Sequence, residues 1–334
     1  MISVILPFYN SEKTIECAIL SVVQQEGVQL ELLLVNNNST DQSLDIARKY
    51  QSTYPDWVSI QDEPRQGVVH AMNCGLSRAR FDWVARMDAD DEWLPDKLKQ
   101  QWAYLQTEGN EGVEVVGTQV KYESDIEATI GFSTYVNWSN GILSSEDIDH
   151  NIFCESPIVN PSVLFKKGLI TEYGLYQEGP FPEDYEMFLR WHSHGVRMAK
   201  VAKELMVWND SNTRLTRTHY AYEPEAFNRV KCAYLAKWLK ANTAYAGNIW
   251  VWGAGRKTRK KLEELEKHGI GIEGFIDLQA NKTSVKPCIS FADIDRSKNP
   301  FIVSFVSNRG KGNEIRQYLK SKSFIEMEHF VIAG

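Results

Sequence analysis

Cysteine is scarce in this sequence, and no two cysteines have the C-x-x-C spacing of zinc sites and redox pairs. The 334 residues contain five cysteines, scattered along the chain as Cys17, Cys74, Cys154, Cys232 and Cys288. An odd number of scattered cysteines argues against a disulfide framework and against structural zinc. It also indicates that the protein works in a reducing compartment.

Long hydrophobic runs are missing as well. No apolar stretch approaches the roughly 20 residues that a transmembrane helix needs. The first ten residues, MISVILPFYN, have neither the basic start nor the small-residue cleavage site of a signal peptide. We therefore expect a cytoplasmic protein, with peripheral contact to the inner face of the cell membrane as an open alternative.

Positive charge is in short supply over most of the chain. The net charge is −7, but residues 244–334 carry 15 basic and 10 acidic side chains, whereas the remainder carries 22 and 34. Because the larger part is acidic, we expect no nucleic-acid partner. With 43% hydrophobic and 24% charged residues, the composition is that of a globular protein. The length suggests two domains at roughly 100–200 residues each.

Strand-like and helix-like segments alternate over the first hundred residues. The apolar runs SVILPFY, LELLLV, WVSIQ and WVARM are typical of buried strands, and apolar residues recur at helical spacing between them. This order predicts an α/β fold with a mostly parallel central sheet and helices on both faces. Ligands of such sheets bind beyond the carboxyl ends of the strands. The polar tips Pro7–Asn10, Asn36–Asp41 and Asp88–Asp91 all follow strands, so we expect them to form one site.

The segment RMDADDEW places three carboxylates directly after a strand. Asp88, Asp90 and Asp91 repel one another unless positive charge lies among them. Two aspartates at D-x-D spacing can hold one divalent cation. Mg²⁺ and Mn²⁺ suit such oxygen ligands and keep positions open for a diphosphate, whose charge the cation would neutralise. From the residues alone, the alternatives are an acidic turn without a metal, or an aspartate that caps the helix near Pro95.

A second acidic pair opens a later helix. In the segment FPEDYEMFLRW, Glu183 and Asp184 precede apolar residues at helical spacing. Acidic side chains at a helix start interact favourably with the helix dipole, by about 0.3–1 kcal/mol each. This stretch alone therefore favours neither a structural nor a functional role for the pair.

Four ordered segments resemble the inverting family-2 glycosyltransferases with the GT-A fold. They are SVILPFYN, LELLLVNNNSTDQS, QGVVHAMNCGLSRARFDWVARMDADDEW and FPEDYEMFLRW, and they follow the family's order and spacing over residues 1–220. The resemblance implies the GT-A nucleotide-diphospho-sugar transferase fold and a Mn²⁺ or Mg²⁺ cofactor. It also implies a nucleotide-diphospho-sugar donor and a saccharide or lipid-linked glycan acceptor.

The same resemblance implies residues that bind the nucleotide and the metal. The implied nucleotide-binding residues are Pro7, Tyr9, Asn10, Asn37, Gly67, Asn73 and Asp88. Asp90 is implied as the metal ligand, together with Asp88. Asp91 is implied as a further ligand or as a helix cap.

The resemblance also implies catalytic residues. Asp184 matches the family's catalytic base, with Glu183 as its neighbour. The late segment WNDSNTRLTRTH resembles a basic loop of some members, in which Arg214 or Arg217 would meet the diphosphate. Surface arginines without this role are the alternative.

One position departs from the family's pattern. The tip of the second strand usually reads D-D-G-S, whereas here Asn36, Asn37 and Asn38 precede Ser39. An amide oxygen can still accept a hydrogen bond from a pyrimidine N–H, but it lacks the charge that makes such bonds roughly twice as strong. A UDP-sugar stays the expected donor. A catalytically impaired nucleotide- or glycan-binding protein of the same fold is the alternative.

The strand–helix pattern restarts after residue 245. The segment WVWGAGRKTRKKLEEL has Gly253 and Gly255 at G-x-G spacing, but Thr258 stands at the third glycine position. Asp277 follows the next strand, 24 positions after Gly253, near the roughly 20 expected of a ribose-binding acid. The segment resembles small Rossmann-type domains. A second nucleotide site and a packing or oligomerisation module, hence a homo-oligomer, both stay open.

We therefore expect three parts: a GT-A catalytic domain over residues 1–220, a helical connector over 221–245 and a Rossmann-like domain over 246–334. The expected function is metal-dependent, inverting hexosyl or N-acetylhexosaminyl transfer from a UDP-sugar in cell-surface polysaccharide biosynthesis. An NAD-dependent oxidoreductase is disfavoured. The tail offers it no convincing acid–base partner, and the first 240 residues would have no role.

Overall fold

The first strand of the chain is buried on both of its faces. All seven residues of β1 (Ile2–Phe8) are buried, as expected for a strand inside a parallel sheet that helices cover from both sides. The computed structural model describes the whole chain except residues 125–129, 213, 242–246, 282–285 and 309. These described residues fall into two compact units. The first consists of Met1–Ile148, Pro157–Gly179 and His194–His219, and the second of Asp149–Ser156, Pro180–Ser193 and Tyr220–Gly334.

The first unit is built on one mixed sheet, whose strand order is β3-β2-β1-β4-β7-β6-β8-β5. Besides β1, its strands are β2 (Leu30–Asn36), β3 (Val58–Asp62), β4 (Trp83–Arg86), β5 (Glu92–Trp93), β6 (Val113–Ser124), β7 (Leu164–Lys166) and β8 (Arg197–Asp210). β7 runs antiparallel to β4 and β6, and β5 runs antiparallel to β8. The other neighbouring strands pair in parallel. The expected α/β fold with a mostly parallel sheet is confirmed.

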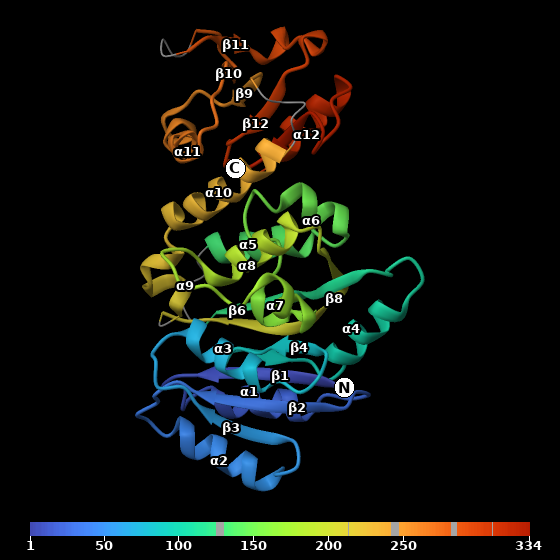
Figure 1. Ribbon diagram of the computed structural model, residues 1–334, viewed down its shortest axis with the longest axis vertical. Helices are drawn as coiled ribbons and strands as arrows, with labels where there is room; N and C mark the ends of the chain where they lie inside the picture. The colour runs from blue at the N-terminus through green and yellow to red at the C-terminus, as the bar shows by residue number, and fades with distance from the viewer. Residues whose placement is uncertain (125–129, 213, 242–246, 282–285, 309) are drawn as a thin grey trace. The chain divides into compact units, whose positions relative to one another are not determined.

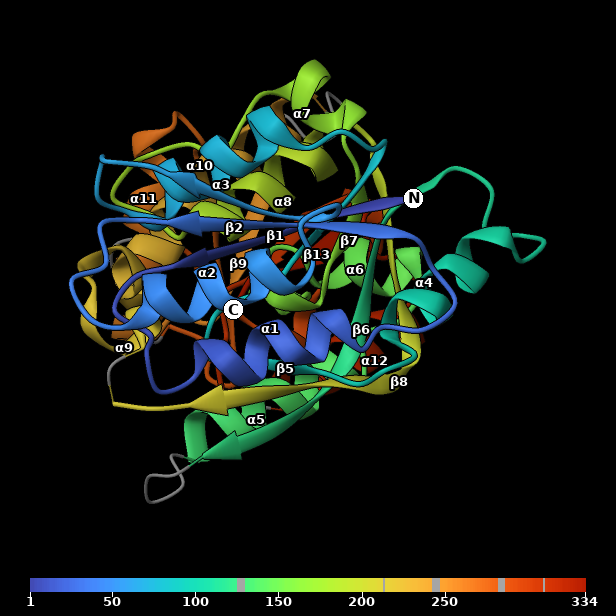
Figure 2. The same cartoon turned by 90° about the horizontal axis from the view of Figure 1, so that it is seen from below.

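Helices cover both faces of this sheet (Figure 1). The helices of this unit are α1 (Ile15–Val23), α2 (Ser43–Thr53), α3 (Val68–Arg78), α4 (Lys97–Gln106), α5 (Ile130–Asn140), α7 (Gly168–Tyr173) and the short α9 (Leu215–Thr218), with α6 (Ser145–Asn151) at the limit of the unit. Figure 2 shows α3 on one face of β1 and β2, and α1 and α2 on the other. Because β4 follows α3 on the opposite side of β1 from β2, the chain reverses its direction across the sheet here. Such a reversal is where ligands bind in α/β sheets.

The carboxyl ends of the central parallel strands lie side by side. Phe8 at the end of β1 is paired with Asn36 at the end of β2, and Ile5 of β1 is paired with Arg86 at the end of β4. The polar tips that follow these strands are therefore neighbours at one edge of the sheet, as the alternation of elements predicts.

The second unit contains a five-stranded sheet in which all strands are parallel, in the order β11-β10-β9-β12-β13. The strands are β9 (Ile249–Trp252), β10 (Gly274–Asp277), β11 (Cys288–Ser290), β12 (Phe301–Ser304) and β13 (Phe330–Ile332). The helices of this unit are α8 (Glu183–Ser193), α10 (Pro224–Ala241), α11 (Arg256–Lys267) and α12 (Lys311–Ser321), with short 3₁₀ turns at η2 (Tyr220–Tyr222), η4 (Phe291–Asp293) and η5 (Arg296–Lys298).

Two local features of the first unit go beyond the sequence-based expectations, and one expectation lies outside the described residues. The segment IVNPSVLF forms only the short β7, preceded by the 3₁₀ turn η1 (Asn160–Ser162), because Pro161 has no N–H to donate to a strand ladder. The long strand β8 has no counterpart in the sequence-based expectations. The expected boundary at residue 245 lies outside the described residues.

Two expected absences can be compared with the structure. All five cysteines lie in the described part and are free thiols. Among the helices that the structure describes, none combines the length and apolar character needed to span a bilayer.

Candidate active site

Three aspartates gather in the loop that joins β4 to β5. Asp88, Asp90 and Asp91 each place a carboxylate oxygen within 4.8 Å of the others. Asp91 is buried, whereas Asp88 and Asp90 are partly exposed. The backbone explains the compactness, because the loop turns tightly: the N–H of Asp91 donates to the carbonyl of Asp88 at 3.2 Å.

Positive charge does lie among these carboxylates, and Arg214 supplies much of it. Its guanidinium is 3.1 Å from an oxygen of Asp91, 3.9 Å from Asp90 and 4.0 Å from Asp88. Arg214 precedes α9, and its guanidinium stacks 4.5 Å from the ring centre of Trp208 near the end of β8. It also donates to the carbonyl of Asn209. The side chain is therefore held on several sides and is 8% exposed.

The burial of this cluster shifts its acid–base equilibria. Burial raises the pKa of Asp90, and the charge of Arg214 opposes this shift. Burial also raises the pKa of Asp91 well above its ordinary value, with Arg214 again opposing it. For Arg214, burial lowers the pKa, but the three carboxylates outweigh burial and raise it overall. The arginine is therefore charged at every pH of interest.

The three carboxylates differ in how many hydrogen bonds they already accept within the protein. Asp91 accepts hydrogen bonds from Arg214 and, at 2.9 Å, from the backbone N–H of Asn209, so it ties the loop to β8. The carboxylate of Asp90 is 36% exposed and lies 3.9 Å from the guanidinium of Arg214, while its backbone carbonyl accepts from the amide of Asn209 at 2.9 Å. The three atoms that could bind a metal ion here are all carboxylate oxygens. Mg²⁺ and Mn²⁺ prefer oxygen ligands of this kind. Asp90 and Asp88 fit such a cation, with Asp91 supporting the loop beneath them.

A second arginine holds Asp88 in place. Arg86 donates to an oxygen of Asp88 at 2.8 Å, and its guanidinium lies 5.9 Å from the ring centre of Tyr176. The backbone of Tyr176 is in turn fixed by Asn73 of α3, whose amide donates to the carbonyl at 2.9 Å and accepts from the N–H at 3.1 Å. Asn73 thus fixes the backbone of Tyr176, whose ring lies near the arginine that holds Asp88. Sequence reasoning missed Arg86 and Tyr176, because nothing in their spacing indicates this contact.

The three consecutive asparagines after β2 form a clasp on the loop that follows β3. Asn36 donates to the carboxylate of Asp62 at 2.9 Å, and Asn38 donates to the carbonyl of Pro64 at 2.5 Å. Asn37 is 3% exposed and donates to the carbonyls of Glu63 and Arg65, at 2.9 and 2.7 Å. We call Asn36–Asn38 with this loop the asparagine clasp.

The clasp explains why amides stand where the family usually has acids. A carbonyl oxygen can only accept a hydrogen bond, and an ionised carboxylate has none to donate. Asn37 also accepts the N–H of Gly67 at 2.8 Å, so its amide uses both ends within the protein. Gly67 has φ +131°, a conformation that side chains rarely adopt, and it directly precedes α3.

The tip of β1 offers exposed side chains at the same sheet edge. Pro7 is buried within β1, whereas Tyr9 is 50% exposed. Asn10 has φ +47°, and its side-chain oxygen accepts the N–H of Thr40 at 2.8 Å, which links the first and second tips. Residues of the tips of β1, β2 and β4 are therefore tied into one edge, although their roles toward a nucleotide stay predictions.

Arg217 contacts a different carboxylate from Arg214. It donates to Asp210, the last residue of β8, at 2.8 Å, and its guanidinium lies 4.6 Å from the ring centre of Phe132. The hydroxyl of Tyr122 donates to the same carboxylate at 2.6 Å. Within the first unit, α9 is thus bound through two arginine–aspartate pairs.

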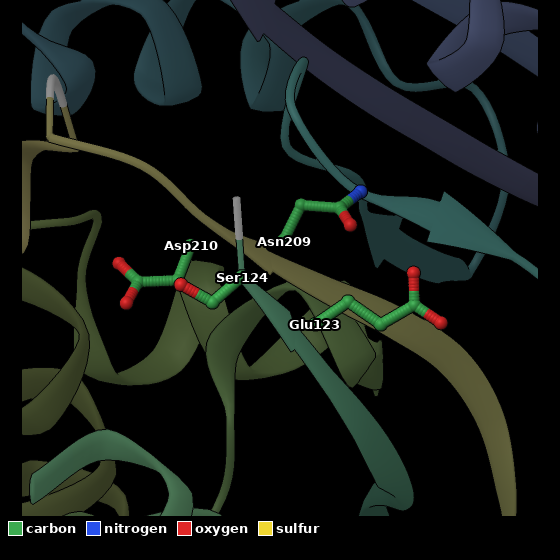
Figure 3. A pocket seen from close by; sticks show the side chains of 4 residues that line it. All are labelled: Glu123, Ser124, Asn209 and Asp210. Atoms are coloured by element: carbon green, nitrogen blue, oxygen red, sulfur yellow. The ribbon is translucent and has the colours of Figure 1, made fainter. Parts of the chain in front are cut away.

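A pocket of about 260 Å³ lies beside Asp210, at the ends of β6 and β8. Glu123, Ser124, Asn209 and Asp210 line it. Figure 3 shows that the carboxylates of Glu123 and Asp210 point in opposite directions. The four side chains therefore do not converge on one ligand, and the chemistry is better sought at the neighbouring aspartates.

The predicted base lies in the second unit. Asp184 stands in the first turn of α8, where its carboxylate accepts the N–H of Tyr185 at 2.7 Å. Glu183 is 5% exposed and accepts the hydroxyl of Tyr222 at 2.5 Å. Because these residues and the aspartate cluster belong to different units, the roles of Asp184 and Glu183 stay predictions.

In the turn Gly253–Gly255 of the C-terminal region, a side chain of the same protein accepts a backbone N–H. Asp277 accepts the N–H of Ala254 at 2.8 Å, so its carboxylate supports the turn. A Cβ atom on Gly253, which has φ +103°, would lie 2.9 Å from the hydroxyl of Thr258. Thr258 thus packs directly against the turn, whereas a Cβ atom on Gly255 would meet nothing within 4 Å.

Comparisons with known proteins agree with this arrangement. The family model described as glycosyl transferase family 2 matches residues 3–157. AmsE from Erwinia amylovora, a glycosyltransferase of amylovoran biosynthesis, is 31% identical over 62% of this chain and 75% of AmsE. EpsE from Bacillus subtilis (strain 168) is 37% identical over 66% of this chain and 77% of EpsE. The chain belongs to glycosyl transferase family 2.

Another relative of this family-2 glycosyltransferase is matched over a smaller share of its own length. The protein is 28% identical to an uncharacterized glycosyltransferase of Haemophilus influenzae over 56% of this chain, but the match spans only 59% of that relative.

Two solved structures share the fold. S. aureus TarS 1–349 in complex with UDP-GlcNAc matches 80% of this chain and 71% of its own, with a TM-score of 0.57 and 19% identity. The mannosyltransferase PcManGT from Pyrobaculum calidifontis, in complex with GDP-Man and Mn²⁺, matches 80% and 72%, with a TM-score of 0.50 and 19% identity. At such identities the likeness shows the fold alone, which is the GT-A fold.

The asparagine clasp makes a prediction about stability. Asn37→Asp should lower the free energy of unfolding at neutral pH by about 1–3 kcal/mol, because the buried carbonyl of Glu63 and the partly buried carbonyl of Arg65 lose their donors. The deficit should shrink as the pH falls, since a protonated carboxyl can donate again. Chemical unfolding of both proteins at several pH values measures this.

Asn10→Asp is the matched control, because the side chain of Asn10 acts as an acceptor and a carboxylate preserves this role. Equal unfolding midpoints for the two variants at neutral pH would contradict the clasp.

Proposed function

We propose that this protein is a metal-dependent, inverting glycosyltransferase that uses a nucleotide-diphospho-sugar, in the first place a UDP-sugar. The acceptor is a hydroxyl of a saccharide or of a lipid-linked glycan in cell-surface polysaccharide biosynthesis. The observation that carries the proposal is the cluster of three carboxylates within 4.8 Å, at the carboxyl edge of the sheet of a family-2 fold.

The donor would bind over the tips of β1, β2 and β4. Tyr9, with its exposed ring, suits the face of a base, and the partly exposed Asp88 suits a ribose hydroxyl. Asp90 and Asp88 would hold Mn²⁺ or Mg²⁺, which supplies positive charge to the leaving diphosphate. Arg214 lies within 4.0 Å of all three aspartates and would share in stabilising that charge. PcManGT, which has this fold, was solved with GDP-Man and Mn²⁺, which supports the proposal that this protein uses a metal as well.

The transfer itself needs a base for the acceptor. The bond between the sugar C1 and the diphosphate oxygen breaks, and its electron pair leaves with the nucleoside diphosphate. A new bond forms between C1 and the acceptor oxygen on the opposite face, and the hydroxyl proton passes to a carboxylate. We assign this carboxylate to Asp184, because it stands partly exposed in the first turn of a helix and matches the family's base position.

A relative's name and the distribution of charge support the acceptor and the cellular place of the reaction. The relative AmsE is named for amylovoran biosynthesis, which supports a polysaccharide product. Nucleotide sugars are polar, so we place the reaction in the cytoplasm, with a lipid-linked acceptor reached at the inner membrane surface. The excess of basic residues over 244–334 suits such a contact.

The alternative of a binding protein without turnover had its basis in the three asparagines. Their amides have partners in the asparagine clasp, so they need no loss of catalysis to explain them. For the C-terminal region we propose a Rossmann-like module. Its strand order puts the first strand of the region at the centre of the sheet, as in doubly wound folds. Since Asp277 is occupied by the glycine turn, we favour packing or self-association over dinucleotide binding there.

The metal site makes a prediction about nucleotide affinity. Asp90→Asn should weaken Mn²⁺-dependent binding of UDP by at least about tenfold, the size of effect seen even for residues that only support metal ligands. Calorimetric titration with UDP, with and without Mn²⁺, measures this. Glu92→Gln is the control, because Glu92 is an exposed carboxylate outside the cluster. Equal UDP affinity with and without the metal in the wild type would refute the metal site.

The base assignment makes a prediction about turnover. Asp184→Asn should lower the rate of transfer, or of donor hydrolysis, by about 10²–10⁴-fold, the usual contribution of a general base. UDP affinity should stay unchanged, because the base contacts the acceptor. The rate of UDP release from a panel of UDP-sugars measures this, and a variant with wild-type turnover would remove Asp184 from the role.

A further inference from the structure

Helix α8, which carries the proposed base, is bound by two tyrosines from the segment that follows residue 219. The hydroxyl of Tyr222 in η2 donates to the carboxylate of Glu183 at 2.5 Å. The hydroxyl of Tyr234 in α10 donates to the carboxylate of Glu186, also at 2.5 Å. Both glutamates are buried, with exposed fractions of 5% and 3%. All four residues belong to the second unit.

Further contacts, from α10 and from Ile152, fix the start of α8. Arg229 of α10 donates to the carbonyl of Pro180, just before α8, at 3.0 Å. The rings of Phe227 and Tyr185 pack with their centres 5.6 Å apart, and the hydroxyl of Tyr185 donates to the carbonyl of Ile152 at 2.6 Å. The first half of α10 is therefore a support for α8 and does more than connect two parts of the chain.

The two tyrosine–glutamate bonds differ in what surrounds them. Glu186 also forms an ion pair with Arg190 one turn further along α8, at 3.0 Å, so its charge is compensated within the helix. The bond of Tyr222 instead reaches the residue directly before Asp184. The first turn of a helix has N–H groups without intrahelical partners and opens more readily than its middle. An additional hydrogen bond matters most at this place.

We infer that Tyr222 is a positioning residue for the transfer reaction. Its hydroxyl holds Glu183, and with it the first turn of α8, so that the carboxylate of Asp184 keeps the orientation in which it takes the acceptor proton. A displacement of about 1 Å in a reacting group can cost on the order of 10²-fold in rate, so loss of this hydrogen bond should be measurable. The inference rests on the proposed function, in which Asp184 is the base.

The test compares Tyr222→Phe with Tyr234→Phe. Each substitution removes one hydroxyl that donates to a buried glutamate of α8 and leaves the ring in place. The measured quantities are kcat and KM for UDP release from UDP-glucose and from UDP-N-acetylglucosamine with Mn²⁺, the Kd of UDP, and the melting temperature. Tyr222→Phe should lower kcat by about tenfold with KM and Kd unchanged. Tyr234→Phe should lower the melting temperature by at least as much as Tyr222→Phe and keep the wild-type kcat.

The outcomes separate this inference from the proposed function. A wild-type kcat for Tyr222→Phe, beside an inactive Asp184→Asn, would overturn the positioning role and leave the function intact. Equal losses of kcat in both tyrosine variants would also overturn it, because the effect would then be one of general stability. Absence of UDP release by the wild-type protein from every UDP-sugar would overturn the proposed function, and this inference with it.

Discussion

Three carboxylates within 4.8 Å of one another are the constraint on which the arrangement of the first unit depends. Unscreened charges at this distance repel strongly, so the fold must bring cations to them. Arg214 reaches all three from the segment after β8, and Arg86 reaches Asp88 from the end of β4. With all three aspartates ionised, two arginines leave one negative charge over. Such a charge attracts a divalent cation.

Hydrogen bonds join loops at several places along the carboxyl edge of the sheet. Asp91 joins the loop to β8 through the N–H of Asn209, and Asn73 of α3 holds the backbone of Tyr176 against Arg86. On the other side, the asparagine clasp ties the tip of β2 to the loop after β3. A parallel sheet collects these loops at one edge, and hydrogen bonds between loops then fix their relative positions. The rigidity of the site comes from contacts between residues far apart in sequence.

The sequence predicts the sheet and the aspartates well, because both depend on local patterns. Buried parallel strands appear as uninterrupted apolar runs, and the order of elements places their polar tips together. The pairing of Arg214 with Asp91 spans more than a hundred residues and leaves no periodic signal. The exchange of acids for Asn36–Asn38 looked like a loss of charge toward the nucleotide, whereas the amides of Asn37 and Asn38 bind backbone carbonyls of the same protein. Likewise, α10 looked like a connector, because helical periodicity shows which residues face inward but not which helix they contact.

The central claim is that Asp90 and Asp88 hold a divalent cation that meets the diphosphate of the donor. The most direct measurement is the anomalous difference density of Mn²⁺ in a crystal soaked with Mn²⁺ and UDP. The account predicts one strong peak in contact with carboxylate oxygens of both aspartates and with a phosphate oxygen of UDP. UDP bound at this sheet edge with no manganese peak there, its diphosphate held by Arg214 alone, would contradict it.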